Sequence, residues 1–319
     1  MNSSTSWSLP LPFRSRFTNR TQIVVPEGAV LLYGVFEERS EIDEGWLNLF
    51  GPENVFEVIP TDNLLTLSVP RYSSSQLSLR NQNELTGLAE AFRDKTVYLD
   101  ITGLPHHVWM PILRSCLRVG QALRIIYVEP EGYTTNPNPK PGEFFDLSDS
   151  LQGLQPIPGF AKLRLRRAEM LRLVPLLGFE GIRFRYLVEQ LEPSERDIFP
   201  VIGVPGFKPS YPFHTYEGNS DPLAKTRSWQ RVRYVDASCP FSLFKCLESI
   251  AAYPGQQSMQ VATIGTKPHA LGAALYTIVS PAVELIYDHP VRRKKRSSGM
   301  GVCHVYFVTE FVRGHMDAA

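Results

Sequence analysis

Two stretches of this chain decide its expected fold: VYLDITGLPHHVWMPILRSCLRVGQALRIIYVEP, residues 97–130, and MQVATIGTKPHALGAALYTIVSPAVELIYDHP, residues 259–290. Each starts with an apolar run typical of a buried strand, passes through a glycine-containing turn into Pro-His, and continues with a helical pattern. Each ends in a second apolar run that closes on Ile-Tyr, two further residues and Pro. The sequence therefore predicts two copies of one strand–helix–strand unit. The alternative is that the likeness reflects only the pattern common to all α/β proteins.

Outside these stretches, further apolar runs and helical patterns alternate along the chain. We therefore expect an α/β fold of two tandem Rossmann-like units with parallel-rich sheets, joined by a Pro-rich loop and a helical connector. The expected divisions are a flexible tail over 1–24, a first Rossmann-like unit over 25–133, a linker and basic helical connector over 134–195, and a second Rossmann-like unit over 196–319. Residues 302–311 are expected to form a final strand.

The composition is that of an ordinary globular protein. Of the 319 residues, 43% are hydrophobic and 20% are charged, which excludes wholesale disorder. The 33 Lys and Arg residues nearly balance the 32 Asp and Glu residues, so no global positive field holds nucleic acid. The four cysteines are scattered outside any metal-binding spacing, so we expect free thiols and neither a metal nor a cofactor. Without an apolar run long enough to span a membrane, the protein is expected in the cytoplasm, with no membrane partner.

The turn Gly265-Thr266-Lys267-Pro268-His269 joins a predicted strand to a predicted helix, at the sheet edge where α/β proteins bind ligands. A helix N-terminus presents unpaired N–H groups and a partial positive charge, which suit a phosphate group. Lys267 would add a full charge, Thr266 a hydroxyl donor, and Gly265 room for a close backbone approach. The turn therefore predicts contact with a phosphate or a nucleotide. The alternative is a plain strand-to-helix connection with a solvated lysine.

A strand followed by a Gly-Thr-Lys turn and a helix is similar to the signature turn of CRISPR-associated Rossmann fold (CARF) domains. In the first stretch, Ile101-Thr102-Gly103 resembles the Ile-Thr-Gly that opens the same signature. Two such units in one chain resemble the SAVED domains of bacterial anti-phage systems. The resemblance implies a protein that binds a cyclic oligonucleotide and switches an effector, here a protein partner in trans. The ligand contacts that it implies are Thr266, Lys267 and His269 in the second turn, and Thr102, Gly103 and His106 in the first.

Three further positions are candidate ligand contacts. Glu38 follows the first predicted strand together with Glu37, and an acidic pair there could bind a base or a ribose hydroxyl; the alternative is a solvated helix start. Glu217 lies at the corresponding place in the second unit, with a surface turn as the alternative. Arg293 belongs to the basic run 292–296, which could close over an anionic ligand, contact nucleic acid, or be a solvated loop.

These features favour a nucleotide-sensing or accessory protein of a prokaryotic defence system, of the anti-phage or CRISPR type. An anionic ligand would lie between the two units. No Ser/His/Asp or paired-carboxylate spacing occurs, so we do not expect catalysis. One alternative is a nucleotide hydrolase or nuclease-like enzyme that uses His269 and Lys267 at the same site. The other is a scaffold subunit of a defence complex whose units bind no ligand.

Overall fold

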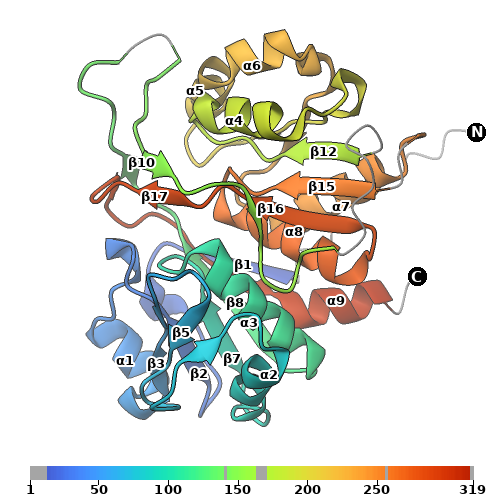
Figure 1. The fold of residues 1–319 in the computed structure, drawn as a ribbon. Helices are drawn as coiled ribbons and strands as arrows, with labels where there is room; N and C mark the ends of the chain where they lie inside the picture. Colours follow the sequence, from blue (N-terminus) through green and yellow to red (C-terminus); the bar gives the residue numbers. More distant parts are fainter. Residues whose placement is uncertain (1–12, 140–141, 163–170, 256–257, 317–319) are drawn as a thin grey trace, which may run out of the picture.

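The computed structural model describes residues 13–139, 142–162, 171–255 and 258–316. The chain forms a mixed α/β fold whose sheets contain parallel strands, which confirms the expected α/β class. Figure 1 shows two sheets, one in the lower and one in the upper half of the view, with helices packed on them. In the described residues, no helix combines the length and the apolar content that a membrane crossing requires.

The first sheet has the strand order β1-β19-β8-β7-β2-β3, in which β8, β7, β2 and β3 run parallel and β19 is antiparallel to both β8 and β1. Its strands are β1 (Arg14–Phe17), β2 (Val30–Tyr33), β3 (Val55–Glu57), β7 (Val97–Asp100), β8 (Leu123–Val128) and β19 (Cys303–Phe307). Its helices are α1 (Glu44–Phe50), α2 (Gln82–Glu90) and α3 (His106–Arg118). A small antiparallel sheet after β3 consists of β4 (Ile59–Pro60), β5 (Thr66–Ser68) and β6 (Leu77–Ser78).

Both ends of the described chain differ from the sequence prediction, because both belong to the first sheet. β1 lies within the expected flexible tail, yet it pairs with β19. β19 also pairs with β8, although the sequence predicts a separate second unit over 196–319. The final strand predicted over 302–311 stops where α9 (Val308–Met316) begins, because Val308, Phe311 and Val312 are spaced to bury one helical face.

The second sheet has β11, β16, β15 and β12 in that order, with β16, β15 and β12 parallel. Single parallel bridges extend it from β12 to β13, which pairs in parallel with β14. Its strands are β11 (Gln155–Pro156), β12 (Leu171–Pro175), β13 (Val201–Gly203), β14 (Arg233–Val235), β15 (Ser258–Ala262) and β16 (Val283–Tyr287). Its helices are α4 (Gly181–Leu191), α5 (Tyr211–Gly218), α6 (Ser220–Lys225), α7 (Pro240–Ala251) and α8 (Lys267–Val279).

The connector predicted over 134–195 differs from the structure in its second half, because β12 and α4 belong to the second sheet. An arginine within an apolar run favours a surface position, but Arg172 of β12 is only 1% exposed. Its guanidinium donates to the carbonyl of Tyr253 at 3.0 Å and lies over the ring of Phe199 at 5.2 Å, so the charge is satisfied in the interior. The basic residues 163–170 of the predicted connector lie outside the described part of the chain.

The two sheets share one topology: strands that follow one another along the chain take corresponding positions in each sheet. In the first sheet, β2 has β3 on one side and β7 and then β8 on the other. In the second, β12 has β13 on one side and β15 and then β16 on the other. The strand order therefore reverses between β2 and β7, the first switch point, and between β12 and β15, the second switch point. Ligands of open α/β sheets bind at such points, beyond the carboxyl ends of the strands.

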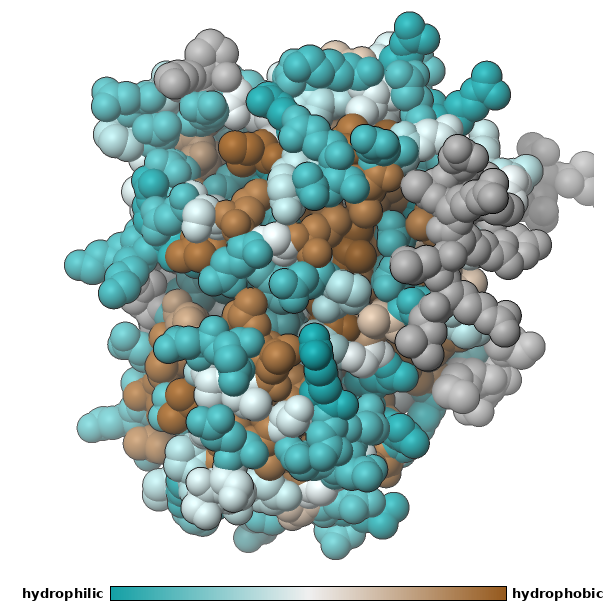
Figure 2. Space-filling model, in the orientation of Figure 1, coloured by the Kyte–Doolittle hydropathy of each residue, from teal (hydrophilic) through white to brown (hydrophobic). Residues whose placement is uncertain are grey.

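One hydrophobic core extends across both halves of the molecule. It contains buried residues of α2 and α3 together with those of α7 and α8, and α3 packs against α8. Smaller cores lie on the other faces of the sheets, under α1 in the first sheet and under α4 and α6 in the second. The surface seen in Figure 2 is mostly hydrophilic, with hydrophobic residues showing in patches between polar ones.

Two short antiparallel pairs carry the chain from the second sheet back to the first. β17 (Pro290–Arg292) pairs with β10 (Ser148–Leu151), and β18 (Ser297–Ser298) pairs with β9 (Gly132–Tyr133). The basic run 292–296 starts at the last residue of β17 and ends directly before β18. Arg292 and Arg296 reach Glu37, which lies in the loop after β2 of the first sheet.

Candidate functional site

A cavity of about 100 Å³ lies at the second switch point. Its wall includes Leu177 and Gly178 after β12, and residues 263–267 after β15, which are the two turns that flank this point. Gly203 and Gly206 extend the wall at the end of β13. The part of the chain before β10 contributes Arg39, His106, Tyr127 and Tyr133. The cavity therefore occupies the place where an open α/β sheet presents its ligand site.

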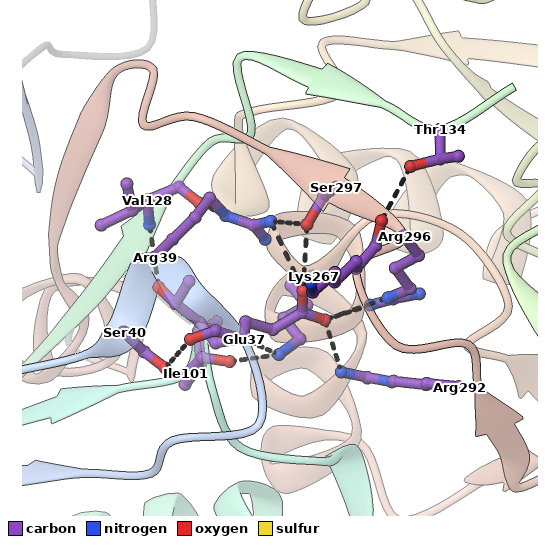
Figure 3. Close-up of polar contacts among 12 residues, drawn as sticks. Glu37, Arg39, Ser40, Ile101, Val128, Thr134, Lys267, Arg292, Arg296 and Ser297 are labelled. Atoms are coloured by element: carbon purple, nitrogen blue, oxygen red, sulfur yellow. Dashed lines mark hydrogen bonds and ion pairs between the residues drawn. The ribbon is translucent and has the colours of Figure 1, made fainter.

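Three arginines of the cavity wall share one carboxylate (Figure 3). Glu37 accepts hydrogen bonds from Arg39 Nη1 at 3.4 Å, Arg292 Nη1 at 3.2 Å and Arg296 Nε at 3.1 Å. Glu37 itself is 3% exposed. Among the described side chains, none of these arginines forms an ion pair with another carboxylate. The Glu37 cluster, as we call these four residues, therefore carries an excess of positive charge.

The excess charge of the Glu37 cluster favours the entry of an anion. Burial opposes ionisation of Glu37, but Arg296, Arg292 and Lys267 outweigh burial and hold the pKa of Glu37 well below its ordinary value. Glu37 is therefore ionised at neutral pH and neutralises one of the three guanidinium groups. Because an uncompensated charge held out of water costs several kcal/mol, an anion in the cavity would stabilise the cluster. The side chains of Arg292 and Arg296 remain partly exposed, so an anion can reach them.

Aromatic side chains form another part of the cavity wall, beside the Glu37 cluster. The aromatic wall, as we call it, consists of Tyr133, Phe179, Phe207 and Tyr211. The ring centroid of Tyr133 lies 5.5 Å from that of Phe179 and 5.8 Å from that of Tyr211. Tyr133 of β9 pairs with Ser297 of β18, and the Ser297 hydroxyl donates to Glu37 at 3.2 Å, so Tyr133 lies beside the Glu37 cluster. Burial raises the pKa of Tyr133. Flat apolar surface beside guanidinium groups suits a planar ring that carries an anionic group.

Lys267 bridges the two glycine-containing turns, which face each other. Its Nζ donates to the carbonyl oxygen of Ile101 at 2.6 Å, to that of Leu104 at 2.9 Å, and to that of Thr102. The side chain is buried, and burial together with Arg292 lowers the pKa of Lys267 well below its ordinary value. Lys267 therefore uses its donors on the protein backbone, instead of presenting them to a ligand as the sequence predicts.

The first switch point is filled by the protein itself. Gly103 lies so close to Gly34 that a Cβ at position 103 would overlap the Gly34 carbonyl oxygen. The Phe36 N–H donates to the carbonyl of Gly103 at 3.2 Å, and the Ser40 hydroxyl donates to that of Gly34 at 2.6 Å. The Leu104 side chain is fully buried beside Gly34. Gly34, Gly103 and Leu104 are therefore outside the cavity wall, to which the first half contributes Arg39 and His106 instead.

Some of the predicted ligand contacts line the cavity, namely Gly265, Thr266, Lys267 and His106. Thr266 also caps α8, since its Oγ1 accepts from the His269 N–H at 3.3 Å. His106 Nδ1 accepts from Trp109 Nε1 at 3.1 Å. Burial, and after it Arg292, lowers the pKa of His106 well below its ordinary value, so the imidazole is neutral. With Nδ1 as the acceptor, Nε2 carries the proton and can donate.

Two predicted contacts are buried away from the cavity wall. Thr102 accepts, through Oγ1, from the Val128 N–H at 2.9 Å. His269 is fully buried, its Nε2 lies 3.0 Å from the carbonyl oxygen of Asp236, and burial lowers its pKa to about 4. Gly103, described above, is also outside the wall. Since Lys267 and His269 both bond to backbone carbonyls, the geometry gives no support to a catalytic role for this pair.

Two of the remaining predicted contacts, Glu217 and Arg293, lie on the surface. The side chain of Glu217 is 57% exposed on α5, outside the cavity wall. Arg293 is also outside the wall and pairs with Asp149 at 2.9 Å and with Asp146. Glu38 begins a short turn of 3-10 helix, but its side chain lies outside the described part of the structure.

The sequence prediction selected Arg293 from the basic run 292–296 and missed Arg292 and Arg296. Arg292 ends β17 and faces the cavity, whereas Arg293 faces Asp149 on the surface. The basic run itself was a signal that sequence reasoning could use. Strand alternation does not sort its members, because residues 293–296 form a turn and not a strand.

In the described residues, no group of three or more His, Cys, Asp or Glu side chains is arranged to hold a metal ion, and all four cysteines are free thiols. No protein-family model matches the chain, and no curated protein matches it. The described residues of the site supply excess guanidinium charge, an imidazole N–H and an aromatic wall. Such a set can bind an anion that carries a planar ring.

Proposed function

We propose that the protein binds an anionic, nucleotide-like ligand at the second switch point and acts as a nucleotide-sensing or accessory protein. The observation that carries this proposal is the Glu37 cluster, in which three arginines of one cavity wall share a single carboxylate. A phosphate group would accept charge-assisted hydrogen bonds from Arg292 and Arg296. The aromatic wall beside them offers a stacking surface for a nucleobase.

The proposal includes a duplicated fold, in which each sheet and its helices form one of two tandem Rossmann-like units. Two observations support it. The strand order β8-β7-β2-β3 of the first sheet matches β16-β15-β12-β13 of the second. The turn at 101–104 after β7 also faces the turn at 265–269 after β15, through Lys267.

The proposed cellular role is in a prokaryotic defence system of the anti-phage or CRISPR type, where the bound nucleotide would control a protein partner in trans. This part of the proposal rests on the resemblance of Ile101-Thr102-Gly103 and Gly265-Thr266-Lys267 to the CARF and SAVED signatures. Binding without catalysis is proposed because the pair once considered catalytic is bonded to backbone carbonyls. The excess charge of the Glu37 cluster favours a ligand-binding protein over a scaffold without a ligand.

Thermal unfolding with added nucleotides tests the proposal. A nucleotide at about 100 times its dissociation constant should stabilise the chain by about 2.7 kcal/mol. The double variant Arg292→Gln/Arg296→Gln should lose this stabilisation, because the phosphate loses its guanidinium partners. Arg293→Gln is the matched control, since this residue lies in the same run but pairs with Asp149 on the surface. A panel of linear and cyclic nucleotides that leaves the wild-type melting temperature unchanged would refute the proposal.

A further inference from the structure

We infer that the site takes a single mononucleotide, one planar base with one phosphate group, rather than a cyclic oligonucleotide shared symmetrically by the two halves. The inference rests on the proposed function and narrows its ligand class. It follows from three properties of the molecule: the asymmetry of the two switch points, the position of Lys267, and the arrangement of charge and rings around the cavity.

The two switch points do not offer equivalent ligand surfaces. The second contributes residues 263–267 and Gly178 to the cavity wall. At the first, Gly34, Gly103 and Leu104 pack on one another and lie outside that wall. The first half does reach the cavity, through Arg39 in the loop after β2 and His106 at the start of α3, but it has no counterpart there to the turn at 263–267. A symmetric ligand would need matching contacts from both turns.

Lys267 occupies the space that a symmetric ligand would need between the facing turns. Its Nζ donates to three carbonyl oxygens of the first turn, those of Ile101, Thr102 and Leu104. A ligand inserted between the turns would have to break these bonds and leave buried acceptors unpaired, which is unfavourable. Lys267 therefore closes the gap to a macrocycle and separates the ligand cavity from the first turn.

The excess positive charge of the Glu37 cluster adjoins the aromatic wall, whereas Arg183, another arginine of the cavity wall, is paired with Asp288. Tyr133 pairs with Ser297, whose hydroxyl bonds to Glu37, and its ring lies 5.5 Å from that of Phe179 and 5.8 Å from that of Tyr211. A phosphate at Arg292 and Arg296 would thus place an attached base at these rings.

Isothermal titration calorimetry on the full chain tests the inference with defined probes. These are the four nucleoside monophosphates, their nucleosides, inorganic phosphate, and cyclic tri- and tetra-adenylate. We expect at least one monophosphate to bind with a stoichiometry of one per chain, about tenfold or more tighter than its nucleoside. We expect the cyclic oligonucleotides to bind more weakly than that monophosphate.

Tyr133→Ala separates the base contact from the phosphate contact. The substitution should lower the affinity for the monophosphate by about tenfold, which is the loss expected for one stacking partner. The affinity for inorganic phosphate should equal that of the wild type. Tyr133→Phe, which keeps the ring, should bind the monophosphate as wild type does. Equal loss of both probes in Tyr133→Ala, with a normal melting temperature, would overturn the assignment of the aromatic wall to the base.

The remaining outcomes distinguish the inference from the proposed function. Tight binding of a cyclic oligonucleotide without binding of any monophosphate would overturn the inference and leave the proposed function standing. A stoichiometry of two monophosphates per chain would have the same effect. If neither class of nucleotide binds, the proposed function itself fails, and the inference fails with it.

Discussion

The two switch points of this molecule have the same strand order but are built differently: the turns of the first are packed together, and the second has a cavity. At the first, between β2 and β7, Gly103, Gly34 and Leu104 pack together and Lys267 caps the carbonyls of the turn. At the second, between β12 and β15, the corresponding turns line a cavity with arginines and aromatic rings. Topology therefore places a potential site at both points, and the side chains of the loops decide which one remains open.

Lys267 links the two switch points. Lys267 belongs to the turn after β15, at the second switch point, but its ammonium group is bound by the turn after β7, at the first. The lysine that makes the second turn similar to a phosphate-binding signature is therefore the residue that closes the first. The cations available to a ligand come instead from Arg39 and the segment 292–296.

The largest effect is expected from Lys267→Met, which breaks the closure of the first switch point. The substitution leaves three buried carbonyl oxygens without a donor, so we expect a loss of about 3–5 kcal/mol in the free energy of unfolding. Urea unfolding measures it. Lys245→Met is the control, because Lys245 is 40% exposed, and surface changes stay within about 0.5 kcal/mol. Equal stability of the two variants would show that Lys267 does not bridge the turns.

A smaller effect is expected from Gly103→Ala, which tests how tightly the first switch point is packed. The added Cβ would overlap the Gly34 carbonyl and the Ser40 hydroxyl, so we expect a loss of about 2–3 kcal/mol. Gly87→Ala in α2 is the control, since its Cβ would meet only the Tyr72 hydroxyl at 3.4 Å and alanine favours a helix. Thermal unfolding of both variants gives the comparison. A neutral Gly103→Ala would mean that the first switch point has free space.

A third effect, a loss of about 2 kcal/mol in the free energy of unfolding at acidic pH, is expected at the contact between the two halves. His107 of α3 and His289 after β16 lie with ring centroids 5.3 Å apart, both 5% exposed, and in the described residues their ring nitrogens have no hydrogen-bond partner. Burial, and after it His289, lowers the pKa of His107 to about 3. The unfolded chain, with a His pKa of about 6.5, therefore takes up the proton first as the pH falls.

Keeping His107 neutral costs no unfolding free energy above about pH 6.5. Below that pH the free energy of unfolding falls progressively, until the pH reaches the pKa of His107 in the folded chain. From about pH 7 to pH 5 we expect His107 to account for about 2 kcal/mol of lost unfolding free energy. His107→Phe, which keeps a ring beside His289, should show a correspondingly flatter pH dependence in urea unfolding. An unchanged dependence would show that the imidazole is protonated without cost in the fold.

Much of the fold follows from sequence patterns that are local. The strands β7, β8, β15 and β16 and the helices α3 and α8 are predicted by apolar runs and helical spacing, and the structure confirms them. The sequence does not predict that β12 belongs to the sheet. The buried guanidinium of Arg172 donates hydrogen bonds to backbone carbonyls that only the folded chain brings near. α9 is missed because the alternation in residues 302–307 masks the helical spacing that begins at Val308.

The candidate site was predictable in position and not in its residues. The glycine turns and the switch-point rule place it at the correct sheet edge. Whether Lys267 faces a ligand or the opposite turn depends on carbonyl groups 163 to 166 residues away, which no local pattern contains. Glu37 belongs to the acidic pair that the sequence marks after the first strand, but its pairing with Arg292 and Arg296 is not predicted for the same reason, since these partners are remote in the chain.

A crystal structure with brominated adenosine monophosphate tests most directly whether the second switch point is the ligand site. The anomalous signal of bromine locates the base without interpretation of weak density. We predict one bromine position per chain beside Phe179 and Tyr211, with the phosphate at Arg292 and Arg296. A bromine position between residues 101–104 and 265–269, or none within the cavity at a concentration that saturates binding in solution, would contradict this assignment.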